Sequence, residues 1–374
     1  MRFCATCAFG FEAMVKNECQ TLGFELTGGE NGKVFFDGDF ETMMKANLSL
    51  RTAEHVYLVL KEEKITTFDA LFDLIKAVDF RAFIRPEGQF IVNAKSHKST
   101  LFSLRDIQKI TKKAWIENLK HTFDETTFLE KGPQYNLLIV IDNDQCSVLL
   151  DTSGDALHKR GYRENQGKAP LKETLAAALI MQSFYRADRI LIDPFCGSGT
   201  IAIEAALMAK NIAPNINRSF AFEAFKRFDH KLFKNLKRQY LKAIKQDEPV
   251  KIIASDIDPK MVEMAKDNAF NAGVDDAIHF KVSDFKYMDY TLPYAIVITN
   301  PPYGQRLEEE KNLKPLYEDL GKVIKKHPDN SYYIFTSFMG FEKTIGNYAD
   351  KTRVLFNGRI KSRLYQYFGP KPPV

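Results

Sequence analysis

The chain has 374 residues, of which 45% are apolar, so it can bury enough surface for two or three domains. It has no uninterrupted run of about 18 apolar residues and no long apolar segment near its start, which argues against a membrane protein and against export. The net charge is +5, and the five cysteines are few and odd in number. We therefore expect reduced thiols, no disulfide framework and a cytoplasmic location.

The first 65 residues alternate between short strand patterns and one helical pattern. A first strand contains Cys4 and Cys7, further strands are predicted at 33–36 and 56–60, and a helix is predicted over 12–20. This alternation predicts a small α+β unit. The Cys4-x-x-Cys7 pair lacks the second pair or nearby histidine of a zinc site, so we interpret it as two small strand residues and expect no metal.

A second unit follows, with one face rich in basic residues. Its predicted elements are a helix near 69–78, a strand over 89–94, a basic helix over 103–119 and strands over 135–141 and 145–151. A cluster of basic residues here faces one acid, Asp106, and is expected to bind RNA phosphates; it comprises Lys95, Lys98, Arg105, Lys109, Lys112 and Lys113. A second basic run over 218–245 has an amphipathic pattern, so a solvated helix face is an equally good interpretation there.

The pattern changes after residues 152–170, which are rich in glycine and charge and are predicted to contain a domain boundary. Helices are then predicted over 176–187, 201–210, 259–271 and 313–326, and strands over 189–193, 251–255, 278–282, 294–299 and 331–337. Such alternation predicts a parallel, doubly wound sheet. Segments 353–356 and 364–368, with Asn357-Gly358 available for a turn, predict an antiparallel pair at the end.

A glycine loop follows the strand over 189–193 and reads Asp193-Pro194-Phe195-Cys196-Gly197-Ser198-Gly199-Thr200. Doubly wound sheets bind nucleotides where such a loop meets a helix N-terminus, although the G-x-G pattern alone also fits a simple packing turn. Asp256 and Asp284 end the next two strands, which makes a row of three acids. This row repels pyrophosphate but suits a cationic nucleoside such as S-adenosylmethionine.

In that arrangement each acid has an expected partner on the ligand. Asp193 would meet the methionine amine, Asp256 the ribose hydroxyls and Asp284 the adenine amino group. Asp258 is better interpreted as the cap of the helix that begins at Pro259.

The stretch Asn300-Pro301-Pro302-Tyr303 ends the strand over 294–299. Neither proline has an N–H to satisfy, and their fixed φ stiffens the turn so that carbonyls can project into the site. If the Asn300 side-chain oxygen and the Pro301 carbonyl accept both hydrogens of an exocyclic base amine, its lone pair can face a methyl donor. Tyr303 would stack on the unpaired base. A bare turn is the alternative interpretation.

These motifs resemble those of class I methyltransferases that modify exocyclic base amines. Together with Asp151 to Arg163, Ala169 to Glu173 and the continuation to Leu307, they resemble bacterial THUMP-containing RNA methyltransferases, including the half of the large-subunit ribosomal RNA enzyme that methylates guanine at N2. Members were often labelled adenine-specific DNA methylases. The resemblance implies a Rossmann-like α/β methyltransferase sheet with an antiparallel last strand, preceded by α+β ferredoxin-like and THUMP units.

The resemblance also implies domains and site residues. Residues 1–65 would be ferredoxin-like, 66–155 the RNA-binding THUMP domain and 156–374 the methyltransferase domain. Pro170 and Leu171 would approach the methyl donor. The expected cofactor residues are Pro170, Leu171, Asp193 to Thr200, Asp256, Ile257, Asp284, Phe285 and Asn300; the catalytic ones are Asn300, Pro301, Pro302 and Tyr303. Lys159 and Arg160, beside His158, are further candidates for RNA contact, with a surface loop as the alternative.

The leading hypothesis is methyl transfer from S-adenosylmethionine to guanine N2 in structured RNA, most simply ribosomal RNA. Adenine N6 in DNA or RNA, and a non-catalytic RNA-binding or assembly factor with a nucleotide pocket, remain alternatives. An NAD-dependent dehydrogenase fits less well because the loop lacks a third glycine. Cys196 is interpreted as a small loop residue, since a cysteine nucleophile for pyrimidine carbon would be expected at the position of Asn300 to Tyr303.

Overall fold

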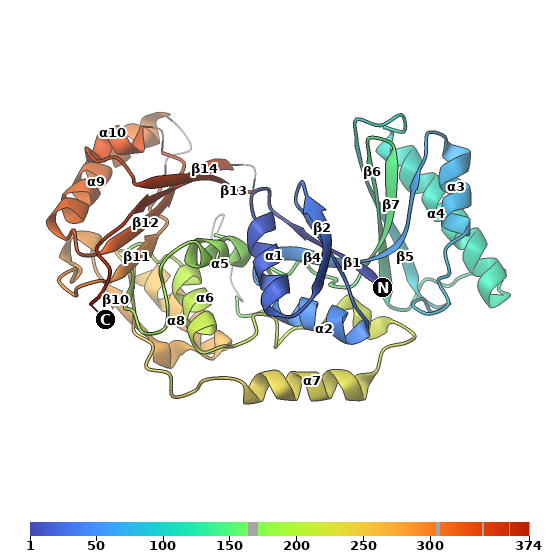
Figure 1. The fold of residues 1–374 in the computed structure, drawn as a ribbon, viewed down its shortest axis with the longest axis horizontal. Helices are drawn as coiled ribbons and strands as arrows, with labels where there is room; N and C mark the ends of the chain where they lie inside the picture. Colours follow the sequence, from blue (N-terminus) through green and yellow to red (C-terminus); the bar gives the residue numbers. More distant parts are fainter. Residues whose placement is uncertain (164–170, 304–306, 339, 359, 374) are drawn as a thin grey trace. The chain divides into compact units, whose positions relative to one another are not determined.

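A computed structural model describes residues 1–163, 171–303, 307–338, 340–358 and 360–373, without the side chains of Glu30 and of 307–312 (Figure 1). The chain divides into two compact units. One comprises Met1–Cys7, Val15–Leu157 and Arg218–Arg238, and the other Ala8–Met14, His158–Asn217 and Gln239–Val374. Helices α1 (Glu12–Thr21) and α7 (His230–Lys242) each contain residues of both units.

The first unit is built on a seven-stranded sheet with the order β2-β3-β1-β4-β7-β6-β5. All neighbours pair antiparallel except β5 and β6, which are parallel. The strands are β1 (Arg2–Cys7), β2 (Glu25–Glu30), β3 (Lys33–Asp37), β4 (Ala53–Lys64), β5 (Gln89–His97), β6 (Gln134–Asp142) and β7 (Gln145–Asp151). The helices of this unit are α2 (Phe40–Ser49), α3 (Phe68–Lys76) and α4 (Leu104–Phe123).

Local sequence explains where these helices begin. Asp39 and Thr42 form a capping box at α2, and Ser103 accepts from the Asp106 N–H at the start of α4. Trp115 on α4 is fully buried and packs edge-on against Phe90 of β5. Its burial fixes which face of α4 turns inward and leaves the basic face to solvent.

The second unit is built on the sheet β10-β9-β8-β11-β12-β14-β13. The first five strands in that order are parallel, whereas β14 runs antiparallel to both β12 and β13. The strands are β8 (Leu191–Asp193), β9 (Ile252–Asp256), β10 (Ile278–Val282), β11 (Ile296–Thr299), β12 (Ser331–Thr336), β13 (Lys351–Asn357) and β14 (Ile360–Tyr367). Its helices are α5 (Glu173–Met181), α6 (Thr200–Ala209), α8 (Pro259–Ala272), α9 (Leu307–Lys326) and α10 (Phe341–Ile345). Short 3₁₀ turns lie at Asp275–Ala277 and Phe285–Tyr287 of this unit and at Ala221–Ala224 of the first unit.

The predicted fold class is confirmed, including the antiparallel last strand, while several element boundaries were wrong. The helix predicted over 176–187 is α5, which starts at Glu173 and ends at Met181. The strand predicted from residue 294 begins at Ile296, because Tyr294 has φ 61° and interrupts the extended backbone. Strand β2 and helices α2 and α10 were not predicted.

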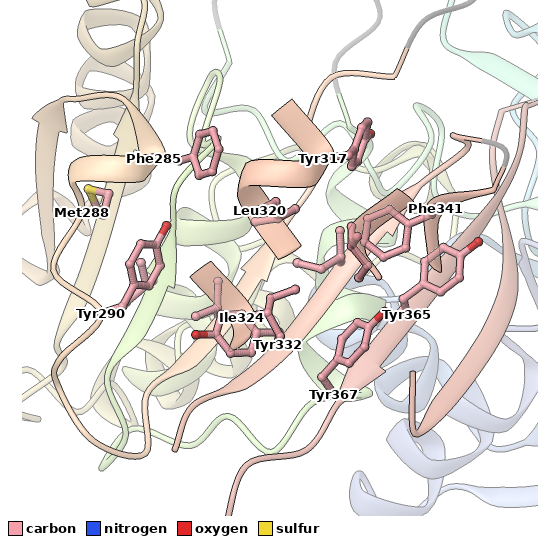
Figure 2. Packing of buried hydrophobic residues seen from close by; sticks show 14 of the residues in the cluster. Phe285, Met288, Tyr290, Tyr317, Leu320, Ile324, Tyr332, Phe341, Tyr365 and Tyr367 are labelled. Carbon is pink, nitrogen blue, oxygen red and sulfur yellow. The ribbon is translucent and has the colours of Figure 1, made fainter. Parts of the chain in front are cut away.

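The aromatic core of the second unit lies between α9, α10 and one face of the sheet. Figure 2 shows Tyr317, Leu320 and Ile324 of α9 beside Tyr332 of β12 and Tyr365 of β14. Tyr317 stacks on Phe338 with ring centroids 4.4 Å apart. Within the described residues, no helix is both long enough and apolar enough to cross a membrane.

Candidate active site

The glycine loop joins β8 to α6 at the carboxyl edge of the second sheet. Gly197 and Gly199 have φ of 51° and 84°, a region that favours glycine. A Cβ on Gly199 would lie 3.0 Å from the Ala265 Cβ of α8, so this glycine permits close packing. Nothing lies within 4 Å of a Cβ built on Gly197, so the loop backbone is open to a ligand at that point.

Hydrogen bonds from neighbouring elements hold the loop in place. The Cys196 N–H donates to the Ser255 carbonyl at 2.8 Å, and the Gly197 N–H donates to Asp256 Oδ2 at 3.0 Å. Asn268 of α8 donates to the Ser198 carbonyl at 3.0 Å. Asp256 thus positions the loop, and its carboxylate oxygens keep lone pairs that a ribose can use.

Cys196 is 6% exposed, and burial raises the pKa of its thiol, with Asp193 and Asp256 adding to that rise. A reactive cysteine needs its thiolate, which this site disfavours. The interpretation of Cys196 as a small loop residue is therefore supported.

Asp193 is almost fully buried, yet only one of its oxygens is satisfied. Oδ1 accepts from the Thr299 hydroxyl at 2.8 Å and from the Phe195 N–H at 3.3 Å. Oδ2 is buried and has no hydrogen-bond partner among the described residues. Burial raises the pKa of this carboxyl to about 7, against the lowering effect of those two donors. A buried orphan acceptor beside an open glycine is the arrangement that a cationic amine would complete.

Two further acids, Asp258 and Asp284, follow the ends of β9 and β10. Asp258 caps α8 by accepting from the Lys260 N–H at 2.9 Å, which confirms its predicted structural role. Asp284 caps the turn Phe285–Tyr287 and lies 3.4 Å from the Lys286 ammonium group. Phe285 packs against Phe195, whereas Ile257 is 70% exposed. Ile257 is thus an exposed apolar side chain directly after the end of β9.

Asn300 follows β11 at the same edge of the sheet. Its Oδ1 atom is buried and has no hydrogen-bond partner among the described residues. Such an atom costs about 1–3 kcal/mol unless a ligand donates to it. Tyr303 accepts a hydrogen bond from Asn357 Nδ2 at 3.0 Å, at the end of β13. The continuation of this motif over 304–306 lies outside the described residues.

Tyr317, which the sequence analysis did not single out, holds the proline turn from behind. Its hydroxyl lies 2.9 Å from the Pro302 carbonyl and 2.8 Å from Thr336 Oγ1, and that Oγ1 accepts from the Phe338 N–H at 3.0 Å. Because the carbonyl can only accept, the Tyr317 proton points to Pro302 and the Thr336 hydroxyl donates to Tyr317. These hydrogen bonds connect the end of β12 to the proline turn.

Arg163 links the glycine loop to the segment that precedes α5. Its Nη2 donates to the Leu171 carbonyl at 2.8 Å and to the Thr200 hydroxyl, and its Nε lies 3.3 Å from Glu173. Burial raises the pKa of Glu173, while the Arg163 guanidinium opposes that rise. Leu171 therefore lies close to Thr200 at the start of α6. Pro170 lies outside the described residues.

The expected RNA contact of Arg160 was wrong. Arg160 is 2% exposed, and its Nε lies 3.3 Å from Glu204, which is fully buried. A buried guanidinium paired with a buried carboxylate cannot reach a phosphate without losing that pair. Lys159, in contrast, is exposed.

The basic residues predicted on the first unit lie on β5, α4 and the loop between them. Arg105, Lys109 and Lys113 follow a four-residue spacing on α4 and are exposed, as are Lys95 and Lys98. Lys112 differs, because it is paired with Glu130 at 3.0 Å.

Phe102 lies in the same loop and is 80% exposed. Phe102 was not predicted as a site residue, although an exposed aromatic side chain with Lys98 and Arg105 nearby in the sequence is typical of stacking platforms for single-stranded RNA. The described residues contain no group of three or more histidine, cysteine or acidic side chains that could hold a metal.

Three family descriptions match the chain in sequence order. They are an RlmL ferredoxin-like domain over residues 2–57, a THUMP domain over 66–151 and an RMKL-like methyltransferase domain over 160–366. The last covers more than half of the chain.

Individual proteins match over nearly their full length. YpsC of Bacillus subtilis strain 168, a candidate RNA methyltransferase, is 44% identical over 371 residues, which cover 99% of this chain and 96% of that protein. A solved methylase candidate from Clostridium difficile 630 is 41% identical with a TM-score of 0.95, covering 100% of this chain and 99% of its own. SMU.472, a methyltransferase candidate solved in complex with SAH, is 38% identical with a TM-score of 0.92 at coverages of 100% and 99%.

Proposed function

Because the chain belongs to the RMKL-like family of S-adenosylmethionine-dependent methyltransferases with ferredoxin-like and THUMP domains, we propose that it methylates guanine N2 in large-subunit ribosomal RNA. The THUMP domain and the similarity to an RNA methyltransferase candidate support an RNA substrate. Support for guanine N2 comes from the motifs over 151–307, which resemble the half of the ribosomal RNA enzyme with that activity. The proposal places the enzyme in the cytoplasm, where its RNA is.

The cofactor supplies an electrophilic methyl group on a sulfonium centre. In the proposed site Asp193 Oδ2 accepts from the amino-acid ammonium, Asp256 accepts from the ribose hydroxyls, and Gly197 lets the ligand approach the loop backbone. Ile257 and Asp284 would contact the adenine ring and its amino group. Leu171, held by Arg163, would cover the donor from the other side.

The proposed chemistry rests on one observation: the buried, unpartnered Oδ1 of Asn300 at the end of β11. Two acceptors, this atom and the Pro301 carbonyl, would bind the two hydrogens of the base amine and turn its lone pair toward the methyl group. Tyr317 fixes the turn through the Pro302 carbonyl, so the acceptors need no rearrangement on binding. Tyr303 would stack on the base, which must first leave its helix.

The test uses ribosomal RNA from cells that lack this chain, incubated with tritiated S-adenosylmethionine and purified enzyme. Digestion to nucleosides is expected to yield labelled N2-methylguanosine, whereas labelled N6-methyladenosine would replace guanine by adenine as the target. Asn300→Ala is expected to lower transfer at least 100-fold while SAH still binds by calorimetry. Asn17→Ala, at an exposed position of α1, is the matched control. Equal turnover of Asn300→Ala and wild type would remove Asn300 from the mechanism.

A further inference from the structure

A cavity of about 280 Å³ lies at the carboxyl end of β12. Its wall shares a residue with the hydrogen-bonded chain behind the proline turn, because Thr336 lines the cavity and reaches Pro302 through Tyr317. The principal lining residues are Thr336, Phe338, Val354, Lys361, Arg363 and Tyr365. None of its lining residues is acidic.

Strand register places the two cations of this cavity at the catalytic edge of the sheet. Thr299, the residue before Asn300, pairs with Ile334 of the neighbouring strand β12. Thr336, two residues further on, pairs with Arg363 of β14. Adjacent strands lie about 4.8 Å apart and residues rise about 3.4 Å along a strand, so the Cα of Thr336 lies roughly 8 Å from that of Thr299, and the Cα of Arg363 roughly 12 Å from it.

The charges at this position are not neutralised by acids. Lys361 and Arg363 are exposed, and neither pairs with a carboxylate among the described residues. Arg363 lies 5.9 Å from the centre of the Tyr365 ring, which orients the guanidinium. By contrast, Lys286 and Lys322 at a second cavity, of similar size, both pair with Asp319. A cavity with two cations and no acid selects an anionic ligand.

We propose that this cavity binds the backbone phosphate next to the target nucleotide of the RNA, an inference that rests on the proposed function. A base that enters the site must leave its stack, and the phosphates on either side of its ribose move with it. Lys361 and Arg363 bind that phosphate, while Val354, which is 42% exposed, and Phe338 offer an apolar wall to the sugar. The contact positions the nucleotide and reads no sequence.

The experiment compares wild type, Lys361→Gln/Arg363→Gln and a charge-matched control, Lys325→Gln/Lys326→Gln, in the last turn of α9. The RNA is an unmodified large-subunit transcript. Binding is measured from 50 to 200 mM salt, and ethylation interference maps the phosphates that the protein needs. Calorimetry with SAH checks the cofactor site, and single-turnover transfer gives the dependence on RNA concentration.

For Lys361→Gln/Arg363→Gln we expect the slope of log affinity against log salt concentration to be smaller in magnitude by roughly 1.4 to 1.8. Each of the two cations is expected to contribute about 0.7 to 0.9 to that slope. Its RNA affinity at 0.1 M salt should fall at least tenfold, with SAH binding unchanged and the control like wild type. In wild type alone, ethylation of a phosphate adjacent to the methylated nucleotide should block binding.

The inference is overturned if the cavity variant keeps the wild-type slope and interference pattern. It is also overturned if millimolar inorganic phosphate displaces RNA from the wild type and reduces its salt slope as much as the double substitution does. The cavity would then be a site for free phosphate. A wild type that transfers no methyl group to any RNA would instead contradict the proposed function, because the salt slope and interference map report on the cavity without turnover.

Discussion

Tyr317→Phe removes one hydroxyl from the chain that ends on the Pro302 carbonyl, and it changes no apolar contact. Tyr317 lies 2.8 Å from the buried Thr336 hydroxyl, which loses its acceptor, and 2.9 Å from the carbonyl of the exposed Pro302, which loses its donor. Leaving the buried Thr336 hydroxyl unpaired costs about 1–3 kcal/mol, and the Pro302 carbonyl is no longer held, so we expect the turn to shift. A displacement of about 1 Å at the reacting groups reduces a rate by roughly 100-fold.

The assay is single-turnover methyl transfer at saturating RNA and cofactor, together with SAH affinity by calorimetry and urea unfolding. We expect transfer to fall between about 10-fold and 100-fold while SAH affinity stays within about twofold, because the proposed cofactor contacts of Asp193 and Gly197 come from β8 and the loop after it, not from the proline turn. A purely structural role would lower stability alone.

Tyr332→Phe is the matched control for this experiment. Tyr332 is 1% exposed, lies in the same core and donates to the His327 carbonyl at 3.0 Å, just before β12 begins. It should lose comparable stability and keep its rate. Thr336→Ser, which retains the hydroxyl, should also transfer at close to the wild-type rate. Equal rates for Tyr317→Phe and Tyr332→Phe would refute the positioning role of Tyr317.

Two further predictions follow from buried charge and exposed aromatic surface. In cofactor-free protein, burial raises the pKa of Asp193 to about 7, from the ordinary carboxyl value of 3.8. The folded protein keeps a proton that the unfolded chain loses, so the unfolding free energy falls as the pH rises from about 4 to about 7. Asp193→Asn should therefore gain about 3 kcal/mol of unfolding free energy relative to wild type between pH 5 and pH 8, while SAH binding is lost; identical pH profiles in urea unfolding would contradict the burial argument. Phe102→Ala should weaken RNA binding about 5-fold to 100-fold without changing the salt slope, whereas Lys109→Ala should reduce that slope; an unchanged affinity in filter binding would remove Phe102 from the RNA interface.

Much of the catalytic edge was predictable because its signals are local. The strand ending at Asp193, the glycines at 197 and 199 and the two prolines each constrain the backbone within a few residues, and the expected family is confirmed. Tyr317 was missed for the opposite reason. Its partners Pro302 and Thr336 are brought to it by the crossover from β11 through α9 to β12, and in the sequence it is one more apolar position on an amphipathic helix.

The error at Arg160 has the same physical origin. A lysine and an arginine side by side in a charged loop indicate an exposed basic surface, and Lys159 is indeed exposed. The partner that draws Arg160 inward, Glu204, lies on α6 within an alanine-rich segment whose other residues give no sign of a buried charge. Only the fold brings the two together.

Two of the buried polar atoms that have no partner among the described residues lie at the candidate site. Asp193 Oδ2 and Asn300 Oδ1 lie at the ends of β8 and β11, which are adjacent strands linked by the Thr299 hydroxyl bond to Asp193. The unpaired carboxylate oxygen of Asp193 favours a cation, whereas the unpaired amide oxygen of Asn300 favours a neutral N–H donor. The two atoms therefore favour two different ligands bound side by side. Under the proposed function, that difference in chemistry would order the two ligands along the edge of the sheet, with the cationic donor at β8 and the base amine at β11.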